Sequence, residues 1–424
     1  MVKYKVPQLS FLITSLFVVL LFINMKFFGF LPAESLNGIA DSVNRTGEVI
    51  IVGLVILLLL FKSTVIKLDY WTKFIVFVLV SILVCGLYSV VAYNQSFFDI
   101  YVMENCMLLL FIIPIFTNNE PLFEKILKVI VVFAMVNVFI SCLQSVLYNN
   151  FGIIFLQGIE RTVLRNNLLR YGNAASYAPL LAIFLIGDYK KATEFIPKTV
   201  RLIFLFLSIY CIVFVNQTRG TTIAVLCAVF GMLLFKNRGN KKRIFTLIAL
   251  ALSIVVVMNI PQFQYIFNSI LSDNSKYAAE AHNVNIRIEN IFYRLSFFEK
   301  NPIFGMGIIR PITSPLVHIA RGPSGLYYAD DVGIFDTIAS FGIFGNLMIF
   351  LVWKRWWRSI LKLRQNKKLY ENVWILGLII YYLISSVSIG YFAPDMIICF
   401  SIAIASIEIQ VQSVQNTFLD KQKG

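Results

Sequence analysis

Charged residues are scarce in this chain, and histidine is almost absent. Only 14% of the 424 residues are Asp, Glu, Lys or Arg, whereas 58% are hydrophobic, and there are two histidines. A soluble domain needs a larger charged fraction to cover its surface, so the composition excludes that class and predicts a multi-pass membrane protein. No cluster of His, Asp and Glu has the spacing of a metal site, and we expect neither a bound metal ion nor another cofactor.

The six cysteines lack the paired spacing of a disulfide framework or a zinc site. They are Cys85, Cys106, Cys142, Cys211, Cys227 and Cys399, and all fall within long apolar runs. A free thiol in such a run behaves as a small apolar group. We therefore expect these residues to pack between helices.

Long apolar runs recur at the length needed to cross a hydrocarbon core of about 30 Å. We predict an all-α integral membrane protein with about 12 transmembrane helices, forming a single domain over residues 1–424, although eleven or thirteen spans also fit the runs. The predicted spans are 9–28, 45–61, 74–92, 98–116, 129–147, 173–189, 200–217, 219–235, 244–262, 332–353, 372–391 and 392–410. Residues 263–331 lie between the ninth and tenth predicted spans, and we expect them to form one large extracytoplasmic loop carrying short helices.

The basic residues predict the orientation of the chain. If the N-terminus is inside, 25 of the 37 Lys and Arg residues fall in inner segments, and an even number of spans places both termini in the cytoplasm. This topology signal, together with attraction to anionic lipid headgroups, accounts for most of the net charge of +15. The charge therefore does not require a nucleic-acid partner.

Arginine is concentrated in the predicted outer segments. These hold nine Arg and three Lys, whereas the inner segments hold six Arg and nineteen Lys. Either residue satisfies the topology signal, but the planar guanidinium group is favoured where phosphate or carboxylate oxygens accept two parallel hydrogen bonds. We interpret the bias as an anionic substrate on the outer face. Ordinary loop ion pairs with acidic residues such as Glu289 are the alternative.

The stretch NVNIRIENIFYRLSFFEKNPIFGMG, residues 283–307, has helical spacing. Asn283, Arg287, Asn290 and Arg294 fall at i, i+4, i+7 and i+11 and form one polar stripe. We expect the helix to end at Asn301-Pro302 and a tight bend to follow, because Gly305 and Gly307 permit one. The two arginines should then project together from a helix at the membrane surface. An interfacial amphipathic helix without any site gives the same pattern.

Three motifs in order resemble the O-antigen ligase and polymerase superfamily of bacterial integral-membrane glycosyltransferases. They are NQTRG at 216–220, Arg287 followed by NPIFGMG at 301–307, and DVGIFDTIASFGIFG at 331–345. A fainter match is LRYGNAASYA at 169–178. Each motif is short, but their order and placement across residues 160–345 make the joint match more specific than any one of them.

The resemblance implies an enzyme that uses an oligosaccharide on undecaprenyl diphosphate as donor. Arginines would stabilise the departing diphosphate, and we expect Arg219 and Arg287 to act in catalysis, with Arg294, Arg170, Arg165 and Arg161 binding substrate. Asp331 is the candidate base, and its neighbour Asp330 is a supporting residue. Two simpler interpretations stay open: Arg219 as a side chain that snorkels at a helix end, and Asp331 as the cap of a helix that begins at Val332. Asp336, one turn further on, is a weaker candidate.

One departure from the ligase pattern favours polymerase over ligase. Where ligases carry a His-Asn pair, this chain has Asp331 and Val332, and neither His282 nor His318 lies in the right context to replace the histidine. Acidic residues at this place resemble the polysaccharide polymerases of the superfamily.

Two other functions remain as alternatives to a polymerase. One is a ligase that transfers finished glycan to another acceptor, and the other is a flippase for the same lipid-linked sugar. The flippase is disfavoured because the Arg and Asn-Pro-x-x-Gly-x-Gly arrangement occurs once, without an internal repeat. The expected location is the bacterial cytoplasmic membrane. The expected partners are membrane lipids, the lipid-linked donor, and the chain-length regulator and flippase of the pathway.

Overall fold

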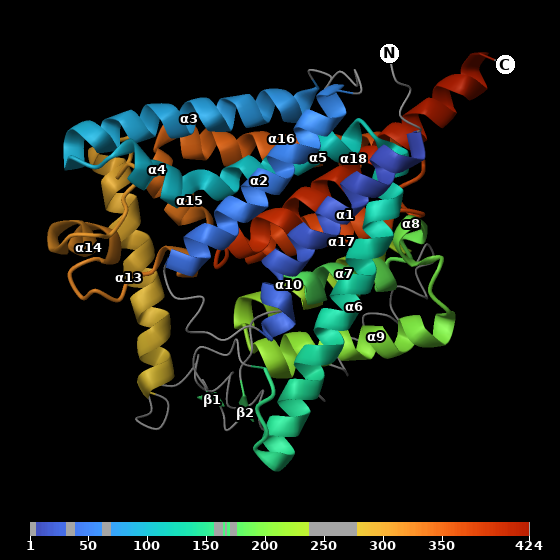
Figure 1. Cartoon of the computed structure of the whole chain (residues 1–424), viewed down its shortest axis with the longest axis horizontal. Coiled ribbons are helices and arrows are strands. Elements are labelled where there is room, and N and C mark those ends of the chain that lie inside the picture. Colours follow the sequence, from blue (N-terminus) through green and yellow to red (C-terminus); the bar gives the residue numbers. More distant parts are fainter. Residues whose placement is uncertain are drawn as a thin grey trace.

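The computed structural model describes residues 6–30, 39–61, 69–156, 164–165, 168–169, 176–236 and 278–423. Within these residues the chain is helical apart from one two-stranded antiparallel ladder, in which β1 (Leu164–Arg165) pairs with β2 (Leu168–Leu169) (Figure 1). The helices of the first half are α1 (Val6–Asn24), η1 (Lys26–Gly29), α2 (Ile39–Phe61), α3 (Tyr70–Tyr93), α4 (Phe97–Glu104), η3 (Asn105–Phe111), α5 (Ile112–Thr117), α6 (Glu120–Phe151), α7 (Tyr177–Ile186), α8 (Lys190–Thr193), α9 (Lys198–Tyr210) and η4 (Cys211–Asn216). Those of the second half are α10 (Arg219–Lys236), α13 (Ala278–Lys300), α14 (Ser314–Arg321), η6 (Ala329–Asp331), α15 (Ile334–Phe341), α16 (Ile343–Gln365), α17 (Val373–Ser385) and α18 (Pro394–Lys423).

Several of these segments are long and apolar enough to cross a membrane. Five qualify among the described residues: Tyr70–Tyr93, Phe97–Thr117, Glu120–Phe151, Lys198–Asn216 and Pro394–Asn416. Five shorter apolar helices accompany them: Leu9–Asn24, Thr46–Leu60, Tyr177–Ile186, Gly220–Lys236 and Val373–Ser385. These findings confirm a multi-pass helical architecture. The number of twelve spans stays a prediction, and the predicted span 244–262 lies outside the described residues.

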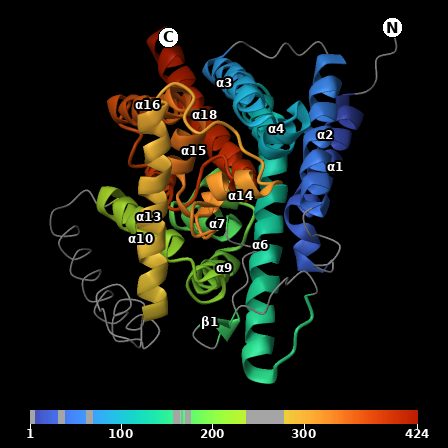
Figure 2. The same ribbon diagram turned by 90° about the vertical axis from the view of Figure 1, so that its left-hand side faces the viewer.

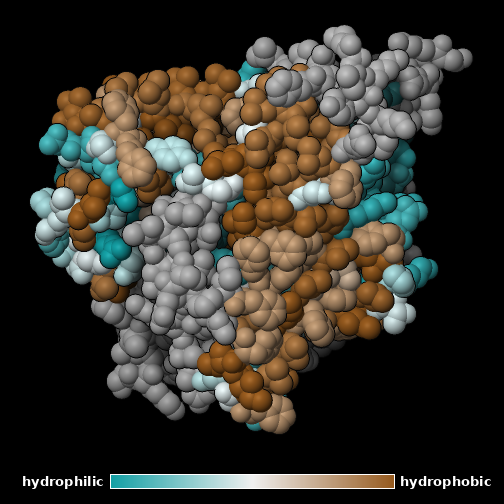
Figure 3. Space-filling model, in the orientation of Figure 1, coloured by the Kyte–Doolittle hydropathy of each residue, from teal (hydrophilic) through white to brown (hydrophobic). Residues whose placement is uncertain are grey.

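Large apolar side chains cover the outside of the bundle. On α3, Val76, Val80, Leu83 and Leu87 follow one another at about one helical turn, and each is close to half exposed. Figure 3 shows hydrophobic residues over much of the face that it displays. An apolar surface of this extent is unstable in water and matches a hydrocarbon environment. The free cysteines, of which all but Cys227 are buried, pack inside the bundle as predicted.

Two of the predicted spans are interrupted in the structure. The segment predicted as 98–116 begins with α4, tightens into the 3₁₀ helix η3 and continues as α5, while the one predicted as 332–353 is divided into α15 and α16 at Gly342 (φ 58°). Periodicity of apolar residues cannot detect such breaks, because both halves of a broken helix are apolar. The α15–α16 break positions the candidate site.

The NPIFGMG loop and the α15–α16 break form one packing unit. The backbone N–H of Met306 donates to the carbonyl of Ala339 (2.6 Å), and that of Ile343 donates to the carbonyl of Pro302 (2.8 Å). Gly305 has a left-handed backbone (φ 64°), and a Cβ atom there would overlap the carbonyl oxygen of Ala339. Two motifs that are separate in sequence therefore hold each other in place.

Replacing Gly305 by alanine is expected to destabilise the protein more than Gly325→Ala, by about 1–3 kcal/mol. Both glycines have positive φ, at 64° and 71°, but nothing lies within 4 Å of a Cβ atom at Gly325. Gly325→Ala thus measures the backbone strain alone, and Gly305→Ala adds the overlap. Thermal unfolding of the purified variants in one detergent measures the difference, and equal midpoints would contradict the interlocked arrangement.

Helix α13 lies across one end of the bundle. In Figure 1 it runs crosswise to α3 and α16, at the end opposite to the one where α1 begins and α18 finishes, and Figure 2 shows it in front of α15 and α16. The predicted end of this helix is confirmed, since α13 stops at Lys300 and the bends at Gly305 (φ 64°) and Gly307 (φ 78°) follow. The predicted loop 263–331 is described from residue 278 on, where it holds α13, α14 and η6.

Candidate functional site

Arg287 and Asp331 meet at the exposed end of the bundle. Nη2 of Arg287, on α13, lies 2.7 Å from Oδ1 of Asp331, at the end of η6, and the two side chains are 48% and 39% exposed. Forty-four positions separate them in the chain. Both were predicted as site residues, and the fold brings them together where a ligand has access to either group. A pair this exposed adds little stability, so its charges are available for binding.

Arg294 occupies the same stripe of α13, but its side chain is buried (2% exposed). Its guanidinium group forms an ion pair with Asp336 on α15, and Nη2 donates to the carbonyl of Ala320 (3.1 Å). Nε donates to Oδ1 of Asn290 (3.0 Å), whose amide group in turn donates to the carbonyl of Tyr328 (2.9 Å). This network ties α13 to α15 and to the segment that carries Asp331.

The expectation that Arg287 and Arg294 project together is confirmed for the face that they share and wrong for their accessibility. Arg294 lies about two turns further along α13 and is buried beside Asp336 on α15, whereas Arg287 is exposed beside Asp331 of η6. Position along the axis, which periodicity does not report, decides which arginine is accessible. Arg294 is therefore placed to position the site, and Arg287 is placed to contact a ligand.

Breaking the buried Arg294–Asp336 pair is expected to cost far more stability than breaking the exposed Arg287–Asp331 pair. Asp336→Asn leaves the Arg294 charge buried without its partner, at about 3–5 kcal/mol, whereas Arg287→Met should cost about 0–1 kcal/mol. The double variant Arg294→Met with Asp336→Asn removes both charges. It should cost less stability than the sum of the costs of Arg294→Met alone and Asp336→Asn alone. Thermal unfolding of the four variants measures these terms, and additive costs would contradict a direct buried interaction.

Asp331 does not cap the following helix. Helix α15 begins at Ile334, its N-cap position is Gly333 (φ 53°), and no side chain makes the capping hydrogen bond. The predicted helix start at Val332 is therefore wrong, and so is the capping role. A Cβ atom at Gly333 would overlap the carbonyl oxygen of Ser386, which also accepts a hydrogen bond from the N–H of Ile334 (2.8 Å). This contact with the end of α17 fixes the turn that presents Asp331.

Two tyrosines form hydrogen bonds in the segments that carry Arg287 and Asp331: Tyr293 lies on α13, and Tyr327 lies just before η6. The hydroxyl group of Tyr293 donates to the carbonyl of Ile319 (2.9 Å), and that of Tyr327 donates to Glu289 (3.2 Å). Desolvation raises the pKa of Tyr293, and desolvation with the nearby Glu289 carboxylate raises the pKa of Tyr327. Both phenols thus stay protonated near neutral pH and act as hydrogen-bond donors.

Arg310 forms contacts within the protein through both its side chain and its backbone. Nη1 of Arg310 lies 2.8 Å from Oδ1 of Asp99 on α4, and its backbone N–H donates to Oε1 of Gln95 (2.7 Å). The amide group of Gln95 also donates to the carbonyl of Ile308 (2.9 Å). Arg310 is one of the nine arginines in the predicted outer segments, and the sequence assigned no role to it. No local signal pairs it with Asp99, which is 211 positions away.

The remaining predicted residues are placed only in part. Arg219 begins α10, separated by two residues from the end of the π-helical turn η4, and Asp330 lies within η6, but their side chains are outside the described part of the structure. Arg165 belongs to β1, whereas Arg161 and Arg170 fall outside the described residues. Gly220 packs so closely against Ser388 that a Cβ atom would overlap its hydroxyl oxygen. The NQTRG motif therefore adjoins the segment after α17.

No group of three or more His, Cys, Asp and Glu side chains that could hold a metal ion occurs among the described residues. The site as described consists of one exposed guanidinium group, one exposed carboxylate and hydrogen-bonding tyrosines. Such a set can bind an anion and accept a proton without further groups.

The fold and this site define a multi-pass helical membrane protein with an arginine–aspartate pair held at one end of the bundle. Residues 203–351 match the sequence model of a protein family described as O-antigen ligase. That interval, about a third of the chain, runs from α9 into α16 and contains Arg219, Arg287 and Asp331. The match supports the resemblance to the O-antigen ligase and polymerase superfamily. No curated protein matches the chain at the significance required.

Proposed function

We propose that this protein is a polysaccharide polymerase that joins undecaprenyl-diphosphate-linked repeat units at the outer face of the bacterial cytoplasmic membrane. The observation that carries this proposal is the exposed Arg287–Asp331 pair, which lies in the part of the chain that matches the O-antigen ligase family. The pair combines the two functional groups that metal-independent glycosyl transfer needs, an anion-binding cation and a base. Both termini would lie in the cytoplasm.

In the proposed reaction the hydroxyl oxygen of the acceptor sugar forms a bond to the anomeric carbon of the donor. The bond between that carbon and the diphosphate oxygen breaks, and its electron pair leaves with the diphosphate. Arg287 stabilises the negative charge that develops on the leaving group, assisted by Arg219, and Asp331 accepts the hydroxyl proton. Arg161, Arg165 and Arg170 are proposed to contact the donor, with Asp330 beside the base. Arg294 acts through the position of α13.

The ion pair gives this mechanism a defined starting state. While Nη2 of Arg287 lies 2.7 Å from Oδ1 of Asp331, the guanidinium group occupies this carboxylate oxygen. A diphosphate carries more charge than one carboxylate and is expected to displace Asp331 from the guanidinium group. Donor binding would then release the base at the moment when the acceptor is needed, which limits wasteful activation of water.

A ligase that transfers finished glycan is the second candidate function. The family description itself favours it, because the matched model is named for O-antigen ligase. The residue at position 331 favours the polymerase, since the chain has Asp331 where the ligase pattern has a histidine. The same arginine chemistry serves both reactions, so the acceptor decides between them.

Glycan analysis of cells that lack the gene tests the proposal. A polymerase predicts single repeat units exposed on the outer face, with long chains absent, and their recovery when the wild-type copy is restored. Long lipid-linked chains that never reach an acceptor would indicate the ligase, and repeat units trapped on the inner face would indicate a flippase. An unchanged chain-length profile would contradict all three assignments.

A further inference from the structure

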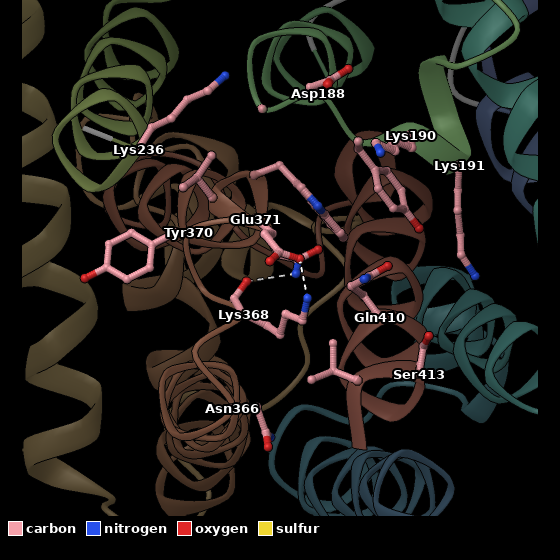
Figure 4. Close-up of a pocket in the computed structure, with 16 residues that line it drawn as sticks. Asp188, Lys190, Lys191, Lys236, Asn366, Lys368, Tyr370, Glu371, Gln410 and Ser413 are labelled. Atoms are coloured by element: carbon pink, nitrogen blue, oxygen red, sulfur yellow. Dashed lines mark hydrogen bonds and ion pairs between the residues drawn. The ribbon is translucent and has the colours of Figure 1, made fainter. Parts of the chain in front are cut away.

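A cavity of about 730 Å³ lies at the end of the molecule where α18 finishes, opposite the end that α13 covers (Figures 1 and 4). Four parts of the chain line it: the turn from α7 into α8, the last residue of α10, the turn from α16 into α17, and residues 410–414 in the second half of α18. None of these residues belongs to the Arg287–Asp331 site. The volume is that of a typical small-molecule or headgroup site.

The wall of this cavity is rigid. The rings of Tyr189 and Trp374 stack with centroids 3.9 Å apart, and both residues are buried. Gly187 packs on Trp374 so closely that a Cβ atom would overlap it. The adjoining turns each contain a non-glycine residue with left-handed backbone, Asp188 (φ 50°) and Lys367 (φ 54°). Each of these residues belongs to a helix ending: the N–H of Tyr189 donates to the carbonyl of Phe184 (3.0 Å) after α7, and that of Lys368 donates to the carbonyl of Leu363 (2.9 Å) after α16.

Positive charge exceeds negative charge in the lining, where four lysines face two carboxylates. Lys191 already pairs with Glu120 and with Glu124 (2.8 Å), and Asp188 pairs with Arg201 (3.0 Å). Lys368 pairs with Glu371 at 2.7 Å. The two remaining lysines, Lys190 and Lys236, are exposed. Among the residues that the structure describes, no carboxylate lies within ion-pair distance of either.

Figure 4 shows how these charges are arranged. The Lys368–Glu371 pair lies in the middle of the lining, with Lys236 on one side and Lys190 on the other, and the amide of Gln410 lies close by. Lys190 and Lys236, which have no carboxylate partner among the described residues, thus lie on either side of Lys368, whose partner Glu371 is exposed. An incoming anion would be attracted by all three lysines, and Glu371 would compete with it for Lys368.

We propose that this cavity binds a phosphate group, held by Lys190, Lys236 and Lys368, with Glu371 displaced from Lys368 when the phosphate enters. Phosphate fits these observations because several oxygens share its charge and can accept hydrogen bonds from separate ammonium groups. Two sources share this chemistry, the headgroup of an anionic phospholipid and a soluble phosphate compound, and the test below distinguishes them. The site is independent of the proposed glycosyl transfer.

The test measures binding to the full-length protein in nanodiscs. Thermal unfolding is followed with inorganic phosphate in phosphatidylcholine discs, and separately as phosphatidylglycerol replaces phosphatidylcholine. We expect Lys190→Gln and Lys236→Gln each to weaken binding about fivefold or more, and Glu371→Gln to tighten it, because the competing carboxylate is gone. Lys354→Gln removes an exposed charge on α16, outside the cavity, and should leave binding unchanged.

The lysine variants should weaken binding, whereas Glu371→Gln should tighten it. This contrast distinguishes a specific site from general electrostatic attraction and from loss of folding. Stabilisation by phosphatidylglycerol alone supports the proposal with a lipid headgroup as the source, and stabilisation by inorganic phosphate supports it with a soluble source. If neither ligand stabilises the wild type, the proposal is overturned. It is equally overturned if Glu371→Gln weakens binding as the lysine variants do, or if Lys354→Gln has the same effect as Lys190→Gln.

Discussion

Replacing Arg287 by lysine is expected to lower glycan-joining turnover by about 100-fold or more, because removing one donor that stabilises transition-state charge typically has this effect. Lysine keeps the positive charge but lacks the planar fork that binds two phosphate oxygens together. The side chain is nearly half exposed and pairs with Asp331 across the surface, so the folded protein should remain. The measurement is the rate of polymer formation by purified protein, beside its thermal unfolding midpoint.

Arg321→Lys is the matched control for this variant. Arg321 is exposed at the end of α14, and its guanidinium group lies 5.3 Å from the centre of the Tyr328 ring. No acidic side chain among the described residues forms an ion pair with it. We expect it to retain most of the wild-type rate. Turnover by Arg287→Lys within a factor of about three of the wild type would contradict the phosphate-binding role of the guanidinium fork.

Replacing Asp331 by asparagine is expected to lower turnover by about 10²- to 10⁴-fold, the range for loss of a general base. Binding of the donor should be unchanged or tighter, because the neutral amide no longer competes with diphosphate for Arg287, which lies 2.7 Å away. This separation of binding from turnover is specific to the proposed exchange. It is measured by donor binding and single-turnover rates on the same protein.

Glu289→Gln provides the control for the carboxylate. Glu289 is an exposed acid on α13, the helix that carries Arg287, and it accepts a hydrogen bond from Tyr327 at 3.2 Å, so its loss changes local charge without removing the proposed base. A mild effect of Asp331→Asn, similar to that of Glu289→Gln, would show that Asp331 is not the base. Weaker donor binding by Asp331→Asn would count against the competition for Arg287.

Local chemistry allowed part of this arrangement to be predicted. The end of α13 before Asn301-Pro302 follows from the restriction that proline places on the preceding residue, and the bends at Gly305 and Gly307 follow from glycine's access to positive φ. Arg287 and Asp331 were both singled out from their motifs. These features depend on a few neighbouring residues, which is why the sequence alone sufficed.

Other features depend on tertiary packing and could not be predicted. The burial of Arg294 follows from where α13 contacts α15, and the pairing of Arg310 with Asp99 joins segments 211 positions apart. The division of one predicted span at Gly342 requires the carbonyl of Ile303 to approach its backbone, where a Cβ atom would overlap it. An apolar run gives no sign of such a neighbour. The alternative interpretation of Asp331 as a helix cap was wrong for the same reason, since contact with Ser386 sets the start of α15.

Chain extension by the purified protein tests the central claim most directly. The protein is reconstituted in liposomes with an undecaprenyl-diphosphate-linked repeat unit from the strain that carries the gene, without added metal, and the products are separated by length. The polymerase proposal predicts a ladder of lipid-linked oligomers with wild-type protein, and only the single unit with Arg287→Lys or Asp331→Asn. A ladder of equal length and yield from both variants would contradict the assignment of the reaction to this pair.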